Sequence, residues 1–104
     1  MSQLSFEESK KIIIDTLVPL GVLRISIFGS FSRHELTSKS DIDILVLLPS
    51  VKNRKLIGLK WFTLDQVLEK KLGRPVDIIS ESALFNPLKS SISQDLKVIY
   101  EKAG

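Results

Sequence analysis

The chain contains no cysteine among its 104 residues, which excludes disulfides, thiolate metal ligands and cysteine nucleophiles. It also lacks a long hydrophobic run, because the segment ILVLL at 44–48 is far shorter than the roughly 20 residues needed to cross a bilayer. The N-terminal MSQLSFEESKK is polar, unlike a secretory signal peptide. These absences predict a cytoplasmic protein with no membrane association.

Neither sign of charge dominates the sequence. Its 15 basic and 12 acidic residues give a formal net charge of +3 and a pI of about 9.3. This mild excess is compatible with a polyanionic partner but does not indicate one. The length suits a single domain, residues 1–104, and a chain of this size buries roughly 60–70% of its unfolded surface.

Hydrophobic spacing and turn-forming residues predict alternating helices and strands. Ser5 and Glu8 have the spacing of a helix capping box, and Pro19-Leu20-Gly21 marks the end of that first helix. Strands are predicted over three apolar, β-branched segments: 22–28, 41–48 and 75–80. Further helices are predicted over a short segment, 31–36, over 56–72, and from Asn86 onward.

The resulting order is α-β-α-β-α-β-α, an α/β (α+β) domain in which helices pack against a small sheet. The apolar residues in register on the helix over 56–72 are Leu64, Val67, Leu68 and Leu72. Those of the last helix are Leu88, Ile92, Leu96 and Ile99. The first two strands are joined by a short connection, so their relative direction stays open between parallel and antiparallel.

Three aspartates lie within the predicted strands. Asp41 and Asp43 are one residue apart, so their side chains share one face, about 7 Å apart. Asp77 interrupts the apolar segment PVDIIS, where an unpaired carboxylate is costly. If the second and third strands are neighbours, the three carboxylates meet at one end of the sheet. Oxygen ligands without His or Cys suit Mg²⁺ or Mn²⁺, and two such ions would neutralise the repulsion and serve phosphoryl transfer.

A glycine–serine pair follows the first strand. Gly29 and Ser30 stand at a predicted strand-to-helix junction, where exposed backbone N–H groups favour a phosphate, and Arg33 is one turn further on. Each feature alone has an ordinary explanation: a tight turn, a solvated arginine, a surface Asp-x-Asp or an edge-strand charge. Their combination in strand order instead indicates phosphoryl or nucleotidyl transfer.

The segment GSFSRHELTSKSDIDILV resembles the signature of the DNA polymerase β-like nucleotidyltransferase superfamily, and more narrowly that of the small minimal nucleotidyltransferases of the MntA type. The family pattern is Gly-Ser, an Arg three residues after the Ser, Ser-Asp-x-Asp, and a distant third Asp. It is matched here by Gly29, Ser30, Arg33, Ser40, Asp41, Asp43 and Asp77. The resemblance extends over essentially the whole chain.

The resemblance implies a nucleotidyltransferase fold with a mixed sheet and a two-metal site. Asp41 and Asp43 would bind two Mg²⁺ ions. Asp77 would complete the ion nearer the acceptor and help to activate the acceptor hydroxyl. Mn²⁺ is a possible substitute for Mg²⁺ at such oxygen ligands.

The resemblance also implies a substrate and a partner. Gly29 and Ser30 would hold the triphosphate of the donor, with Arg33 and Ser40 as further nucleotide-binding residues. The reaction would transfer a nucleoside monophosphate, AMP from ATP, to a hydroxyl and release pyrophosphate. Relatives of this size are often encoded beside a HEPN-domain toxin, act as its antitoxin, and in some cases adenylylate one of its tyrosines.

Two points stay open at the level of the sequence. His34 follows the arginine where family members often have glycine, which leaves the metal site intact but bears on nucleotide preference. The chain has no residues to spare for an acceptor domain, so the acceptor is expected to be a separate macromolecule. The alternative is a catalytically weak or inactive nucleotidyltransferase fold that neutralises its partner by stoichiometric binding. An RNA or small-molecule acceptor is a third, weaker option.

Overall fold

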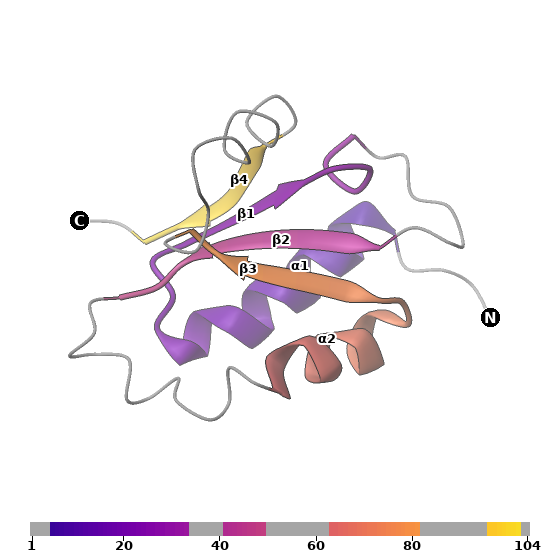
Figure 1. Cartoon of the computed structure of the whole chain (residues 1–104), viewed down its shortest axis with the longest axis horizontal. Helices are drawn as coiled ribbons and strands as arrows, with labels where there is room; N and C mark the ends of the chain where they lie inside the picture. Colours follow the sequence, from indigo (N-terminus) through magenta and orange to yellow (C-terminus); the bar gives the residue numbers. More distant parts are fainter. Residues whose placement is uncertain (1–4, 34–40, 50–62, 82–95, 103–104) are drawn as a thin grey trace.

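The computed structural model describes residues 5–33, 41–49, 63–81 and 96–102, arranged as Figure 1 shows. The helices within them are α1 (Phe6–Leu17), extended by a 3₁₀ turn η1 (Val18–Leu20), and α2 (Leu64–Leu72). The strands are β1 (Arg24–Phe28), β2 (Ile42–Leu47), β3 (Val76–Ser80) and β4 (Lys97–Glu101). Within these ranges, no helix is both long and apolar enough to cross a membrane.

The strands form one mixed sheet in the order β3-β2-β1-β4. β1 runs antiparallel to both β2 and β4, which settles the direction that periodicity left open. β2 and β3 are parallel, and α2 lies between them in the chain, as a parallel connection requires. The predicted α/β (α+β) architecture, a small mixed sheet packed with helices, is confirmed.

Helix α1 begins and ends as its sequence predicts. The Ser5 Oγ accepts a hydrogen bond from the Glu8 backbone N at 3.1 Å, and the Glu8 Oε1 accepts one from the Ser5 backbone N at 2.8 Å. This capping box satisfies two backbone N–H groups that have no partner within the helix. At the other end η1 contains Pro19, and Gly21 stops the helix in a left-handed conformation with φ 90°.

The hydrophobic core lies between the helices and one face of the sheet. Alternate residues of the central strands are buried there, namely Ile25, Ile27, Ile42, Ile44 and Val46. The helices contribute Ile13, Leu17, Leu64, Leu68 and Leu72. The same alternation turns Asp43 toward the opposite face of the sheet. Asp43 therefore lies on the sheet face opposite this core, a face that it shares with the buried Leu45 and Ser26.

Two predicted features of the helices are wrong. Val67 was expected on the core face of the helix over 56–72, yet it is 40% exposed. The residues of α2 that are buried are spaced four apart, namely Leu64, Leu68 and Leu72. The segment 31–36 was expected to be helical, but Phe31–Arg33 form turns, and the remainder lies outside the described residues. The part of the helix predicted over 56–72 that precedes Thr63 also lies outside them.

The predicted last helix is wrong where it can be compared. Leu96 and Ile99 were assigned to it, but Lys97–Glu101 form strand β4 against β1. Valine, isoleucine and tyrosine at the centre of KVIYE favour a strand, and the open edge of β1 supplies the partner. The proposed start at Asn86, with Leu88 and Ile92, lies outside the described residues.

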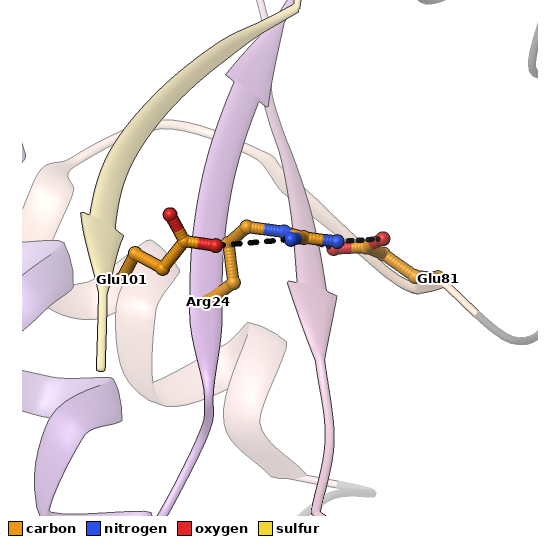
Figure 2. A network of polar contacts seen from close by, with 3 residues as sticks. All are labelled: Arg24, Glu81 and Glu101. Atoms are coloured by element: carbon orange, nitrogen blue, oxygen red, sulfur yellow. Dashed lines mark hydrogen bonds and ion pairs between the residues drawn. The ribbon is translucent and has the colours of Figure 1, made fainter. Parts of the chain in front are cut away.

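Arg24 connects three parts of the sheet at the end distant from Gly29. Figure 2 shows its guanidinium between two carboxylates: Nε and Nη2 donate to Glu81, at 3.0 and 2.8 Å, and Nη1 donates to Glu101 Oε2 at 3.1 Å. Glu81 follows β3 and Glu101 belongs to β4, so the arginine on β1 spans the width of the sheet. The hydrogen bonds to the two carboxylates raise the pKa of the Arg24 guanidinium further above its already high value.

We expect Arg24→Met to lower the free energy of unfolding by about 1–2 kcal/mol. The loss comes mainly from Glu81, whose side chain is 22% exposed and would lose a two-pronged charged partner; Glu101 is 60% exposed and contributes little. Urea denaturation measures the change. Lys11→Met is the matched control, because its ion pair with Asp15 is 77% and 61% exposed and should be worth less than about 0.5 kcal/mol. Equal losses in both variants would contradict the prediction.

Candidate active site

The pairing of β2 with β3 brings two of the predicted carboxylates together. Asp43 of β2 is directly opposite Asp77 of β3 in the parallel register. On its other side Asp43 is opposite Phe28, the last residue of β1, which Gly29 follows. Asp41 immediately precedes β2, two residues from Asp43 and thus on the same face. β2 and β3 are therefore neighbours, which is the condition for the carboxylates to meet at one end of the sheet.

Asp43 is the electrostatic centre of this group. It is partly buried, and this burial raises the pKa of the Asp43 carboxyl; the negative charges of Asp77 and then of Asp41 raise it further. The sequence left Asp77 open between a costly carboxylate within an apolar strand and an edge-strand charge. The structure shows the second: β3 is at the edge of the described sheet, and Asp77 is exposed. The desolvated, repelled carboxylate is Asp43 instead.

The donor set fits a magnesium ion that shares its coordination with a substrate. In the part of the chain that the structure describes, no three acidic or histidine side chains lie close enough to hold a metal by themselves. Mg²⁺ is usually bound by one or two carboxylates together with waters and substrate phosphates, rather than by an all-protein cage. Asp43, beside Asp77 and Asp41, could supply such carboxylate ligands. Burial is the main reason that the pKa of Asp43 is raised, and a cation would offset the further contribution of the two neighbouring carboxylates.

Gly29 is held close to the same carboxylate. Its φ is +71°, and a Cβ added there would lie 2.7 Å from Asp43 Oδ2. The position therefore needs glycine for two reasons, the left-handed backbone and the space that the Asp43 side chain occupies. Ser30 follows and is partly exposed, while Arg33, at the end of the turn, is exposed. Ser40 and His34 lie outside the described residues.

Two residues outside the family motif, Phe31 and Ser32, stabilise this turn. Phe31 is fully buried, and its ring packs on that of Phe6 of α1, with the centroids 5.0 Å apart and the planes tilted by 40°. The Ser32 Oγ donates a hydrogen bond to the Gly29 carbonyl oxygen at 2.8 Å. Lys97 Nζ lies over the Phe6 ring, 5.8 Å from its centroid. A phenylalanine inside the polar run GSFSR was the one sequence feature that could have indicated an anchored turn.

The chain matches a known family along almost its whole length. Residues 8–102 match the family model of the nucleotidyltransferase domain. The matched range includes the whole segment from Gly29 to Asp77. The chain belongs to the nucleotidyltransferase family.

Similar sequences place this chain among the minimal nucleotidyltransferases of the family. The chain is 31% identical over 100 residues to the protein adenylyltransferase MntA of Thermococcus cleftensis, covering 92% of this chain and 97% of that one. It is 45% identical over 76 residues to a Methanocaldococcus jannaschii protein provisionally named a protein adenylyltransferase, covering 72% and 74%. The protein is therefore an enzyme of the minimal nucleotidyltransferase type, similar to protein adenylyltransferases.

Solved structures have the same fold. A structure described as a minimal nucleotidyltransferase superposes with a TM-score of 0.73 at 29% identity, over 93% of this chain and 98% of the other. A chain of a toxin–antitoxin complex with AMP-PNP gives 0.71 at 24% identity, over 89% and 73%. A chain of the complex of tri-AMPylated Shewanella oneidensis HEPN toxin with its MNT antitoxin gives 0.67 at 22%, over 93% and 73%.

Proposed function

We propose that this protein transfers AMP from ATP to a hydroxyl of a HEPN-domain toxin and thereby acts as its antitoxin. The observation that carries the proposal is the pairing of Asp43 with Asp77 beside the Gly29 turn. The name of the Thermococcus relative and the AMPylated toxin in the Shewanella complex support the choice of nucleotide, reaction and partner. A tyrosine is the proposed acceptor, because a phenolic hydroxyl reaches furthest from the surface of a protein partner.

The carboxylates have distinct proposed roles. Asp41 and Asp43, with Asp77, would hold Mg²⁺ or Mn²⁺, which supplies positive charge to stabilise the reacting phosphates. Asp77 is exposed and therefore accessible to an incoming hydroxyl, whose proton it would accept. The acceptor oxygen then bonds to the α-phosphorus, the bond from that phosphorus to the bridging oxygen breaks, and pyrophosphate leaves with the electron pair.

The Gly29 turn would hold the triphosphate. Gly29 has no side chain, so a phosphate can approach the backbone, and Ser30 offers both its N–H and its hydroxyl. Arg33, exposed at the end of the turn, would add a charged donor, and Ser40 is proposed as a further nucleotide-binding residue. The donor phosphates would thus lie against the exposed side of the turn, next to Asp43, whose Oδ2 already fills the space beside the Gly29 Cα.

The experiment is incubation with α-³²P-labelled ATP, Mg²⁺ and a purified HEPN-domain partner. We expect label on the partner. The label should be lost when EDTA removes the divalent ion, and also in the double variant Asp41→Asn/Asp43→Asn. Each treatment would remove the cation that neutralises the negative charge of the reacting phosphates. Autoradiography after denaturing electrophoresis measures the transfer. No label, with the partner still bound and inhibited by both versions of the protein, would instead establish neutralisation by binding alone.

A further inference from the structure

The hydroxyl of Ser32 is buried directly behind the glycine–serine turn. Ser32 is 6% exposed, and its Oγ donates to the Gly29 carbonyl oxygen at 2.8 Å. The neighbouring Phe31 is fully buried against Phe6, which holds this part of the turn on α1. The acceptor of the hydrogen bond is therefore one side of the peptide group that joins Gly29 to Ser30.

The orientation of that carbonyl determines the orientation of the next N–H. In a planar trans peptide the C=O of one residue and the N–H of the next point in opposite directions, and the described chain contains no cis peptide. With the Gly29 carbonyl held toward Ser32, the Ser30 N–H points away from Ser32. The Asp43 side chain leaves no space for a Cβ at position 29, so this residue must be glycine. Glycine also lets the adjoining peptide group rotate at little steric cost, so the orientation of the Gly29–Ser30 peptide needs another restraint.

We propose that Ser32 is a positioning residue, which locks the Gly29–Ser30 peptide so that the Ser30 N–H is presented to the triphosphate of the nucleotide. This inference rests on the proposed nucleotidyl transfer. Ser32 itself touches no reacting atom; it acts through one hydrogen bond to the backbone. Phe31 fixes where the turn lies, and Ser32 fixes which way its first peptide faces.

Ser26 supplies a matched control within the preceding strand. It is 1% exposed, and its Oγ has no hydrogen-bond partner among the described residues. Ser26→Ala therefore removes a buried serine hydroxyl without removing a hydrogen bond within this part of the chain. Ser32→Ala removes one that holds the turn, while Ser32→Thr keeps the hydroxyl.

The first measurement is the dissociation constant of AMP-PNP in the presence of Mg²⁺, by calorimetry. We expect binding to be about two- to tenfold weaker in Ser32→Ala, unchanged in Ser26→Ala, and restored toward the original value in Ser32→Thr. In steady-state labelling of the partner, KM for ATP should rise by a similar factor while kcat stays close to that of the unaltered protein. Equal affinity in Ser32→Ala and the unaltered protein would overturn the inference.

The second measurement is independent of catalysis. In ¹H–¹⁵N spectra of the nucleotide-free protein, the Ser30 amide resonance should shift or broaden in Ser32→Ala, because the peptide is no longer held in one orientation, and should not change in Ser26→Ala. An unaltered Ser30 amide would overturn the lock. A changed amide in a protein that binds no AMP-PNP would instead refute the proposed nucleotide function, so the two failures are distinguishable.

Discussion

Asp43→Asn is expected to abolish nucleotidyl transfer while making the metal-free protein more stable at neutral pH. Replacing residues that merely support metal ligands costs roughly 10- to 100-fold in activity, so if Asp43 is the direct ligand proposed above, its loss should cost at least about 100-fold. Asparagine has nearly the same shape as aspartate and carries no charge. It therefore removes the burial cost and the repulsion from Asp77 and Asp41 that raise the pKa of Asp43.

The sign of the stability change follows from that raised pKa. An acid whose pKa is higher in the folded than in the unfolded state binds its proton more tightly when folded. Its contribution to stability is complete below the pKa of the unfolded chain and is lost as the pH rises through the folded pKa. Above the folded pKa the charge of Asp43 therefore destabilises the metal-free fold. Asparagine relieves this at a partly buried site that solvent still screens, so we expect a modest gain.

Thermal unfolding from pH 3 to pH 8 in EDTA tests this expectation. The melting temperature of Asp43→Asn minus that of the unaltered protein should grow with pH through the range in which Asp43 ionises. Asp15→Asn is the control. Asp15 forms an ion pair with Lys11 at 2.9 Å on the exposed surface of α1 and is not one of the proposed site residues. It should keep full activity. A less stable Asp43→Asn at pH 7, or one with substantial activity, would contradict the prediction.

Gly29→Ala is expected to cost both stability and activity. A non-glycine residue at a φ of +71° is destabilised by about 1–2 kcal/mol, and the added Cβ would meet Asp43 Oδ2 at 2.7 Å. Either the turn or the carboxylate must move. Displacing a catalytic group by about 1 Å can lower the rate about 100-fold, so the loss of activity should be large even when the protein is fully folded.

Gly73→Ala separates the two causes. Gly73 ends α2 with a nearly identical φ of +73°, but an added Cβ there would meet no atom within 4 Å. It should lose about 1–2 kcal/mol through backbone strain alone and keep its activity. Urea denaturation and the labelling assay measure both variants. The prediction would be contradicted if Gly29→Ala and Gly73→Ala lost equal stability and Gly29→Ala stayed active. The close approach of Gly29 to Asp43 would then contribute nothing to activity.

Local chemistry predicted much of the chain. Ser5 and Glu8 form the capping box that their spacing indicated, and Gly21 and Gly73 end helices with positive φ. Such features depend on residues three or four positions apart, so the sequence contains all that they need. The motif from Gly29 to Asp43 and the alternation of Asp43 with buried isoleucines are also local properties.

The C-terminal strand shows where local patterns fail. The apolar spacing of Leu96 and Ile99 suits a helix, but β1 had an unpaired edge, and the backbone hydrogen bonds that it offered decided for a strand. Likewise, Val67 fits the helical period yet is exposed, because the position of α2 on the sheet determines which of its sides is buried. These outcomes depend on partners distant in the sequence.

The sequence by itself determined the cap of α1, the glycines that end the helices, the first three strands and the identity of the acidic and glycine residues. The tertiary structure alone decided that β2 and β3 pair in parallel with Asp43 opposite Asp77, that Asp43 rather than Asp77 is the desolvated carboxylate, and that Ser32 holds the Gly29 carbonyl. The physical reason is the separation along the sequence over which each interaction acts. Capping, turn formation and alternation act within a few residues, whereas strand register, burial and the repulsion between carboxylates exist only once distant segments are packed together.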